Sequence, residues 1–534
     1  MPFHWNQKRL FWLLTCLVGF VVLIPFHDFQ LHLAQGDHGH DLYTFEKALQ
    51  GALPYRDYWL VYGPLMPYYY ALCYLLLGIS IHSVIIGHLF LMYLTGIFIY
   101  LTLSVFVLPL LAWTAAVWYW VFVPPFEHTY NHAGGILIEV IIMYCLFLYI
   151  KEQRFRYVYG ALAGIFLLSL IKLNFGFSNG LGYLIAVMII NRTLQNPWDE
   201  SKQRSFLWGV FLGLLFIGTV YGILIRDLSL YEIRQCFPYL PADHPYHSSW
   251  QKSIQILWQE TVIKISENGY YQALGLLTIF SSGMLAEQMR QRLMENRMRQ
   301  NLGLGLVVLV LFFLLNLHEF LFSGIPYRAQ WSKPYQMLAV FIVIGMALVR
   351  SPRTVVMILC LCLLTLAGHG QWARLKMVKL IKQRQQYIHL KRGGVYIGND
   401  PPWLATVLLT TQYLKTHLKK DETFLALVND PLYYFLTERE SPTRLLSFVE
   451  HIRIQPEQEK ELIRQMEEKG IRWILLSNRA HSEEPGMGVL GHTYCPLLTG
   501  YMAQNFEAVA TFGHWDKSPG WYHNHGVKIL RRTP

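Results

Sequence analysis

Long apolar runs separated by short polar connections dominate roughly the first two thirds of the chain. A transmembrane helix needs about 20 mostly apolar residues, and runs of that length or a little less are typical of membrane spans. The runs cover residues 10–26, 83–106, 108–123, 135–150, 157–171, 176–190, 206–225, 273–285, 302–317, 337–349 and 355–366. The pattern predicts a mainly α, polytopic transmembrane helical bundle with about eleven spans.

Composition agrees with that class. Over 534 residues, 53% are hydrophobic and only 15% are charged, and the mean hydropathy is +0.28. An ordinary soluble globule is more polar. The first run follows Lys8 and Arg9 as a signal peptide would, but it lacks a small-residue cleavage site. We therefore expect it to be retained as a helix.

A shorter aromatic run, residues 65–79, decides the orientation of the bundle. Cytoplasmic loops of membrane proteins carry an excess of Lys and Arg. If this run does not cross, the basic loops share one side, the cytoplasmic side, with Lys8 and Arg9. Those loops carry Lys151, Arg154, Arg156, Arg290, Arg292, Arg297, Arg299, Arg350 and Arg353. We therefore interpret residues 65–79 as an interfacial or re-entrant helix.

The C-terminal part reads as a separate soluble domain outside the cytoplasm. We expect residues 1–370 to form the membrane domain and residues 371–534 a small α/β domain. The outer loops then cover residues 27–82, 124–134, 226–270 and 318–335. Expected strands are 424–428, 473–476, 508–512 and 527–530, with helices at 403–418 and 457–468. Cys236 and Cys495 both fall outside and are able to pair in this arrangement.

The net charge of +11 does not indicate nucleic-acid binding. The basic residues lie mainly in short loops and juxtamembrane segments rather than along one soluble face. Membrane orientation and contact with anionic lipid headgroups account for them better. We therefore expect membrane lipids, and no nucleic acid, among the partners.

Candidate chemistry gathers in the first outer loop. Ionisable groups at the mouth of a membrane are costly unless they face water, a partner or a ligand. Leu42, Phe45 and Leu49 recur at helical spacing, which predicts a helix along the membrane surface, ended by Gly51. Asp37 is expected just before this helix, free to act as a base or ligand, and Asp41 is expected to cap it.

The same loop resembles the GT-C superfamily of polyprenol-dependent membrane glycosyltransferases, in the branch near the protein mannosyltransferases and aminoarabinose transferases. Bacterial members of this family typically show an acidic pair, then a small residue, an aromatic-rich helix ending in Leu-x-x-Gly, a Pro-Tyr-Arg-Asp turn and a Tyr-Gly-Pro-Leu element. Here these are Asp37, Gly39, Tyr43, residues 49–51, residues 54–57 and residues 62–65. Residues 171–176, Ile-Lys-Leu-Asn-Phe-Gly, are similar to a second family element, Thr-Lys-x-x-x-Gly, with Ile171 in place of Thr.

The resemblance implies that Asp37 is the catalytic carboxylate and that the reaction transfers a sugar from a polyprenyl-phosphate donor. His38 stands where a second acidic residue is usual, which leaves open whether a divalent cation takes part. A carboxylate base would activate an acceptor hydroxyl for inverting attack, and positive charge would stabilise the leaving phosphate. Candidate substrate contacts in this loop are His38, His40, Arg56 and Asp57.

Cations in other outer loops are further candidates for the phosphate. They are Lys172, Arg328 and Lys333. Snorkelling to the interface explains Lys172 equally well, and ordinary solvated loop charge explains Arg328 and Lys333.

The second outer loop adds a polar cluster made of Glu127, His128, Asn131 and His132. These side chains suit either a donor sugar or a divalent cation, and hydrogen bonding to helix ends is the plainer alternative.

The sequence thus predicts an integral membrane glycosyltransferase, in a bacterial inner membrane, whose acceptor is a lipid, glycan or protein outside the cytoplasm. Two other classes compete with this prediction. A secondary transporter should show inverted repeats and broken helices near the midplane, and the sequence shows no such symmetry. A non-enzymatic scaffold that binds an envelope partner would be indifferent to replacement of Asp37.

Overall fold

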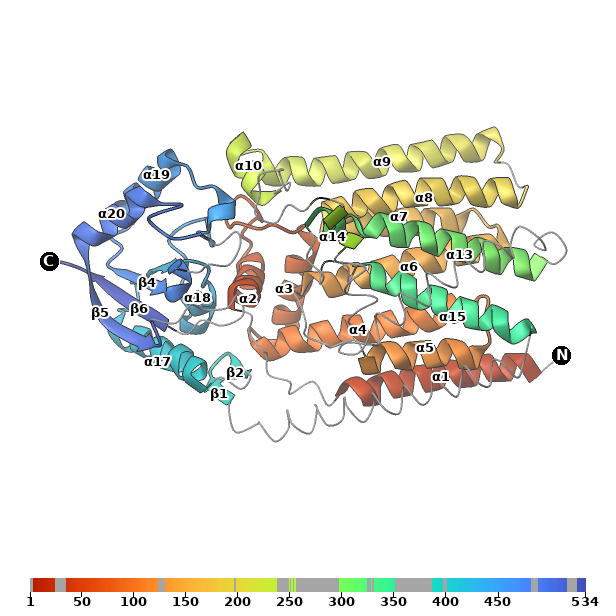
Figure 1. Cartoon of the computed structure of the whole chain (residues 1–534), viewed down its shortest axis with the longest axis horizontal. Helices are drawn as coiled ribbons and strands as arrows, with labels where there is room; N and C mark the ends of the chain where they lie inside the picture. The colour runs from red at the N-terminus through yellow and green to blue at the C-terminus, as the bar shows by residue number, and fades with distance from the viewer. Residues whose placement is uncertain are drawn as a thin grey trace.

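A bundle of long helices makes up one end of the molecule and an α/β region the other, as the computed structural model shows (Figure 1). The structure describes residues 3–24, 35–122, 130–195, 198–237, 249, 251–252, 254–255, 297–323, 328, 331–350, 387–396, 401–481, 488–515 and 526–534. The N-terminus lies at the free end of the bundle. The chain ends in the α/β region, at the opposite end of the molecule.

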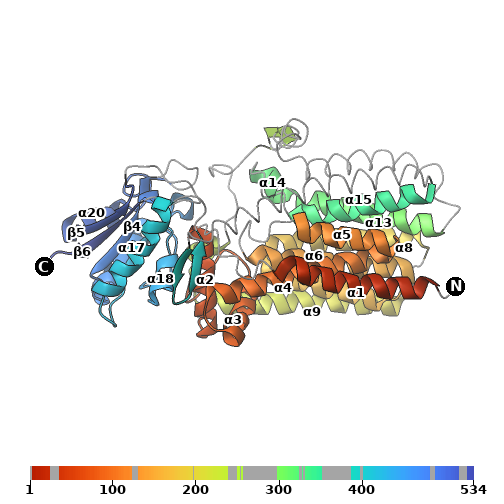
Figure 2. The ribbon, with the colours of Figure 1, turned by 90° about the horizontal axis from the view of Figure 1, so that it is seen from below.

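The long helices lie side by side along the long axis of the molecule (Figures 1 and 2). They are α1 (Phe3–Leu23), α4 (Ile81–Ser104), α5 (Pro109–Phe122), α6 (Asn131–Glu152), α7 (Arg156–Ile171), α8 (Leu173–Thr193), α9 (Glu200–Ile225), α13 (Arg297–Asn316) and α15 (Lys333–Arg350). Each apolar run that falls on described residues coincides with one of them. The runs 273–285 and 355–366 lie outside the described residues.

Length and apolarity mark 5 of the described helices as able to cross a membrane. They are α4, α6, α8, α9 and the segment Gln300–Ser323, which joins α13 to the short α14 (His318–Ser323). On α9 most side chains face outward, and large apolar residues such as Leu207, Trp208 and Phe211 are exposed. An apolar helix with an exposed apolar face is expected where lipid replaces water.

The ambiguous run forms α3 (Leu65–Leu77), a helix of 13 residues. It lies at the end of the bundle beside α2 rather than alongside the long helices (Figures 1 and 2). At about 1.5 Å per residue it is roughly 20 Å long, shorter than a hydrocarbon core of about 30 Å. Gly78 ends it with a positive φ of 88°. This geometry suits the helix that was expected not to cross.

Helix α2 (Gln35–Leu49) lies between the bundle and the α/β region and corrects two predictions. It begins before Asp37, which stands in its first turn, so Asp41 lies inside the helix and does not cap it. Leu42 and Phe45 are fully buried, and protein covers most of the helix. Gly51 follows the helix with a φ of 85°, as predicted.

The C-terminal region, residues 387–534, contains a four-stranded sheet in the order β3-β4-β6-β5. The strands are β3 (Leu425–Leu427), β4 (Trp473–Ser477), β5 (Phe506–Gly513) and β6 (Gly526–Arg532), and only the β3/β4 pair is parallel. The helices are α17 (Pro401–His417), α18 (Leu432–Thr437), α19 (Pro456–Glu468) and α20 (Pro496–Asn505), and a hairpin is formed by β1 (Tyr387–Leu390) and β2 (Gly393–Tyr396).

All four strands and both helices predicted for this region are present within a few residues of their expected bounds. The hairpin, α18 and α20 are additional. The cysteines do not pair as we had considered, because Cys236 and Cys495 are both buried free thiols.

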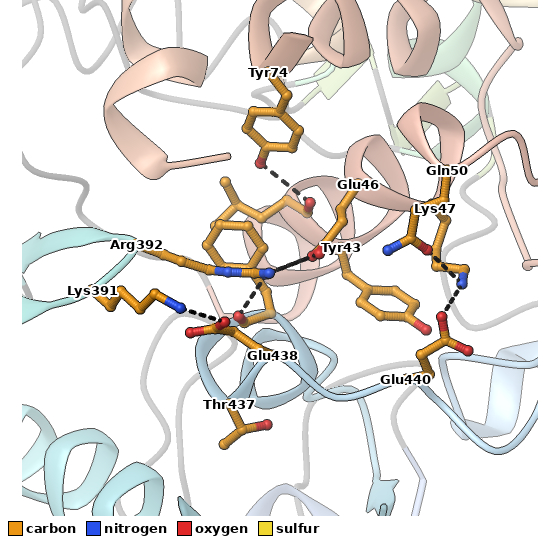
Figure 3. A network of polar contacts seen from close by, with 12 residues as sticks. Tyr43, Glu46, Lys47, Gln50, Tyr74, Lys391, Arg392, Thr437, Glu438 and Glu440 are labelled. Carbon is orange, nitrogen blue, oxygen red and sulfur yellow. Dashed lines mark hydrogen bonds and ion pairs between the residues drawn. The ribbon is translucent and has the colours of Figure 1, made fainter. Parts of the chain in front are cut away.

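A buried ion pair fastens the C-terminal region to α2 (Figure 3). The Arg392 guanidinium donates from Nη1 to Glu46 Oε2 at 2.5 Å and from Nη2 to Oε1 at 2.8 Å. Nη1 also donates to the carbonyl of Phe435 at 3.0 Å, and the guanidinium lies 4.9 Å from the Phe435 ring centre. Both charged side chains are only 11–12% exposed. Such a bidentate pair fixes orientation as well as distance.

Peripheral contacts surround this pair (Figure 3). Lys47 Nζ lies 2.9 Å from Glu440 Oε1, and the Tyr43 hydroxyl accepts the Ser441 N–H at 2.8 Å. The hairpin also rests on the start of α4, where the Ile81 N–H donates to the Arg392 carbonyl at 2.8 Å. The hydrophobic core is accordingly continuous from the bundle through α2 into the sheet.

We predict that Glu46→Gln destabilises the protein by about 3 kcal/mol, because removing one charge of a buried pair leaves the other charge buried without compensation. Thermal unfolding of the detergent-solubilised protein measures this loss. Replacing both partners together, as Glu46→Leu with Arg392→Met, should recover most of it. Glu440→Gln is the matched control, since Glu440 is 72% exposed and an exposed pair contributes about 0–1 kcal/mol. Equal losses for Glu46→Gln and Glu440→Gln would contradict the assignment.

Candidate functional site

The first turns of α2 carry four ionisable side chains in five residues. Asp37 is exposed, whereas His38, His40 and Asp41 are buried at 3%, 6% and 1% exposure. Asp37 is therefore the acidic group of this turn that a substrate can reach.

Surrounding protein raises the pKa of the Asp37 carboxyl, because it displaces much of the water that would stabilise the charge, and the Asp41 carboxylate raises it further. His38, His40 and Arg479 act in the opposite direction. A raised pKa brings a carboxylate closer to the range in which it is an effective proton acceptor.

Asp41 ties α2 to the start of α6. Its Oδ2 accepts the Tyr130 N–H at 3.2 Å and its Oδ1 accepts the Asn131 side-chain amide at 3.3 Å. Tyr130 is the residue preceding the helix, so Asp41 places a negative charge at the positive end of the α6 dipole. Asp41 thus caps a helix, although it is the neighbouring helix rather than its own.

The first residues of α6 connect this acidic turn to a second group of side chains. The Tyr130 ring lies 5.2 Å from the His38 ring, and Asn131 binds Asp41. The next residue, His132, lies 4.9 Å from the Trp331 ring and 5.9 Å from the Tyr62 ring. Three consecutive residues at the start of α6, of which Tyr130 is the N-cap, therefore join Asp41 and His38 of α2 to an aromatic group.

Aromatic rings surround the ammonium group of Lys172, which lies between α7 and α8. Its Nζ is 4.9 Å from the centre of the Phe175 ring, 5.4 Å from Trp331 and 5.7 Å from Tyr62. Glu319 on α14 is its ion-pair partner, 2.6 Å away. The Asn174 side-chain amide donates to Glu319 Oε1 at 2.8 Å. Lys172 is only 16% exposed. It is held by its ion pair with Glu319 and by cation–π contacts with the rings.

Arg328 is a second cation near Lys172. It lies close enough for its charge to act on both Lys172 and Glu319. Two carboxyl groups, Glu319 and Glu139, also act on Lys172. The start of α6 thus links α2, which carries the accessible Asp37 carboxylate, to an aromatic-lined cluster that contains Lys172 and Arg328.

Glycines make the close approaches possible. A Cβ on Gly63 would lie 2.1 Å from the Leu170 carbonyl oxygen, and the Gly63 N–H donates to the Ile171 carbonyl at 2.7 Å. This contact seats the Tyr62-Gly63-Pro64 turn against the end of α7, beside Lys172. A Cβ on Gly135 would lie 2.2 Å from the Trp331 ring. Only a residue without a side chain fits at either position.

The structure brings some of the sequence candidates together and leaves others apart. Asp37, His38, His40 and Asn131 meet around α2, and Lys172 meets Arg328. Arg56 and Asp57 form their own ion pair at 2.8 Å on a half-exposed turn. Lys333 begins α15. Glu127 and His128 lie outside the described residues.

Sequence reasoning missed Glu319, Trp331 and Arg479. Glu319 is an acidic residue at the end of an apolar run, a position at which charge signals function in membrane proteins. That signal could have identified it. Arg479 lies far along the chain in a strand-like context, and nothing in its local sequence distinguishes it.

Among the described residues, no group of three His, Cys, Asp or Glu side chains is arranged to hold a metal ion. The donors nearest Asp37 are committed to other contacts, since His40 bonds the Trp59 carbonyl at 2.9 Å and Asp41 bonds the α6 start. We derive no step through a metal.

The fold is shared with solved membrane enzymes. ArnT from Cupriavidus metallidurans bound to undecaprenyl phosphate matches with a TM-score of 0.51 at 12% identity, over 97% of each chain. The Archaeoglobus fulgidus oligosaccharyltransferase in complex with Zn and sulfate matches with a TM-score of 0.53 at 10% identity, over 88% of this chain and 68% of that one. These are GT-C glycosyltransferases, so the mainly helical GT-C fold expected from the sequence resemblance is confirmed, whereas the count of about eleven spans and the separate C-terminal domain stay predictions. The sequence matches no protein-family model and no curated protein.

We predict that Gly63→Ala destabilises the protein by about 1–3 kcal/mol, because its Cβ would force a backbone carbonyl to move. Thermal unfolding measures the change. Gly218→Ala in α9 is the matched control, since a Cβ there meets nothing within 4 Å, and it should leave the unfolding temperature unchanged or slightly raised. An unchanged unfolding temperature for Gly63→Ala would show that the turn is not held as described.

Proposed function

We propose that this protein is a membrane glycosyltransferase that moves a sugar from a polyprenyl-phosphate-linked donor to an acceptor hydroxyl. The observation that carries the proposal is the pairing of an accessible carboxylate with a cationic cluster across the first turn of α6. Inverting transfer from a phosphate needs these two features on opposite sides of the anomeric carbon. The shared fold with ArnT bound to undecaprenyl phosphate supports the choice of donor class.

The reaction follows from this geometry. Asp37 accepts the proton of the acceptor hydroxyl as its oxygen attacks the anomeric carbon. The bond between that carbon and the phosphate oxygen breaks on the opposite face, and the electron pair leaves with the phosphate. Lys172 and Arg328 stabilise the charge that develops there. No acid is required, because a phosphate is a good leaving group in its anionic form.

Glu319 gives Lys172 a resting partner. The two groups lie 2.6 Å apart, and a donor phosphate would compete with the Glu319 carboxylate for the ammonium. The aromatic rings around Lys172 are suited to stack on a sugar or to line the path of a polyprenyl chain. In this proposal the donor phosphate would meet a charged group and the rest of the donor would meet an apolar lining.

The positions of two basic residues, Lys8 and Lys151, support the membrane orientation expected from the sequence. Lys8 lies beside α4, whose Tyr100 hydroxyl donates to the Lys8 carbonyl at 3.0 Å. Lys151 donates to Val105, also at the end of α4, at 3.2 Å. These basic groups gather at the end of α4 far from the candidate site. Applying the positive-inside rule, we take that end as cytoplasmic, and we propose that the site and the C-terminal α/β region lie outside the cytoplasm.

The first test replaces the base. We predict that Asp37→Asn lowers the rate of transfer of labelled sugar from a polyprenyl-phosphate donor at least ~100-fold, as expected for loss of a general base. Asp227→Asn is the control, because Asp227 is an exposed carboxylate paired with Arg226. Equal activity of Asp37→Asn and wild type would leave a scaffold role as the better account.

The second test replaces the phosphate contact. We predict that Lys172→Met lowers kcat/KM for the donor by about 10- to 100-fold, since one charged contact to the developing anion is lost. Lys172→Arg should retain more activity than Lys172→Met because it keeps the charge. Arg226→Met, which removes a 65% exposed cation, serves as the control. A Lys172→Met variant as active as the Arg226→Met control would contradict the assignment.

A further inference from the structure

The C-terminal region contacts α2 along much of its length. The Glu46–Arg392 pair holds its middle, and a second contact reaches its first turns. A Cβ on Gly39 would lie 2.6 Å from Leu432 Cβ and 2.7 Å from the Leu432 nitrogen. Gly39 is two residues from Asp37, and Leu432 is the first residue of α18. The start of α18 therefore lies directly against the turn that carries the proposed base.

A buried arginine lies behind this contact. Arg479, in the short 3-10 turn Asn478–His481, is 1% exposed. Its Nη1 donates to the carbonyl of Asn429 at 3.4 Å, and Asn429 lies three residues before Leu432 in the loop that meets α2. The guanidinium is close enough for its charge to lower the pKa of Asp37.

Arg479 lies where the negative charges of α2 and of the proposed donor come together. Asp37 and Asp41 are four residues apart on one helix, which makes them neighbours on its surface. The proposed donor brings a negatively charged phosphate to the same place. Charges in a setting with little water repel more strongly than in bulk solvent. The Arg479 guanidinium supplies a compensating positive charge.

We propose that Arg479 is a positioning residue that balances the carboxylates of α2, so that the site is complete only while the C-terminal region is docked there. The guanidinium is buried and acts through Asp37 rather than touching the substrate. This inference rests on the proposed role of Asp37 as the base. It gives the C-terminal region a part in the reaction itself, beyond anchoring.

Further contacts between the C-terminal region and the rest of the protein hold the Arg479 charge in a fixed position. Arg444 donates from Nη1 to the Tyr55 carbonyl at 3.0 Å, and its own carbonyl accepts the Trp59 N–H at 2.9 Å. Together with the Glu46–Arg392 pair, these bonds secure both α2 and the turn that follows it. A region fastened along this whole length keeps Arg479 at a fixed distance from Asp37.

The experiment separates the charge of Arg479 from its packing. Arg479→Met keeps much of the side-chain length without the charge, and Arg479→Lys keeps the charge. We expect Arg479→Met to lower kcat for sugar transfer about 10-fold or more and Arg479→Lys to stay within about 3-fold of wild type. Because the Arg479 charge lowers the pKa of Asp37, its loss in Arg479→Met should also shift the pH dependence of kcat to higher pH, whereas Arg479→Lys should keep the wild-type pH dependence.

A second variant covers the case in which Arg479→Met unfolds. Asn429→Asp is nearly isosteric and adds a negative charge to the residue whose carbonyl accepts from Arg479, so it should lower kcat and shift its pH dependence to higher pH, as Arg479→Met does. It replaces Arg479→Met if that variant unfolds below the assay temperature. An unchanged pH dependence in these variants, or Lys and Met variants of Arg479 that behave alike, would overturn the inference.

The outcome is distinguishable from failure of the proposed function. If Asp37→Asn keeps wild-type activity, the proposed base is wrong and Arg479 has nothing to position. If Asp37→Asn is inactive while Arg479→Met transfers sugar at the wild-type rate, the base stands and only this inference is wrong.

Discussion

The contact between Asp41 and the start of α6 is the constraint on which the rest of the site depends. Its two carboxylate oxygens bind the Tyr130 N–H and the Asn131 amide, and so lock the acidic helix onto the bundle. Tyr130 then packs on His38 and His132 reaches the aromatic group around Lys172. A negative charge at a helix N-terminus is favourable in itself. Here it also fixes the separation between a carboxylate and a cationic cluster that belong to different parts of the chain.

Helix α2 is the common element of the molecule's two halves. One side of it packs on the bundle through Leu42 and Phe45, and the other receives the C-terminal region through Glu46. Partly buried ion pairs are costly to assemble and contribute to specificity of arrangement more than to net stability. The Glu46–Arg392 pair fits that role, because it sets the angle at which Leu432 and Arg479 approach the first turn. The accessible Asp37 is thus placed by protein on both sides of it.

Much of this was predictable from the sequence, and the misses have physical causes. Apolar runs and β-type patterns identified the long helices of the bundle that lie on described residues and the four strands of the C-terminal sheet, since burial imposes those periodicities. The start of α2 was misplaced because Gly36 and Gly39 are poor helix formers, whereas tertiary contact with Leu432 requires a glycine at position 39. Asp41 was assigned to its own helix because a cap is a local signal, while its actual partners are about ninety residues away. Lys172 was identified, but its pairing with Glu319 and the approach of the distant Arg479 to Asp37 depend on tertiary packing.

The central claim is that Asp37 and the Lys172 cluster act on opposite faces of the anomeric carbon. The most direct measurement is the stereochemistry of transfer by the purified protein, using a polyprenyl-phosphate sugar of defined anomeric configuration and determining the product's configuration by NMR. The account predicts that the product has the inverted configuration, with polyprenyl phosphate released in equal amount. A product that retains the donor's configuration would contradict the account, as it requires a covalent intermediate that this arrangement does not provide.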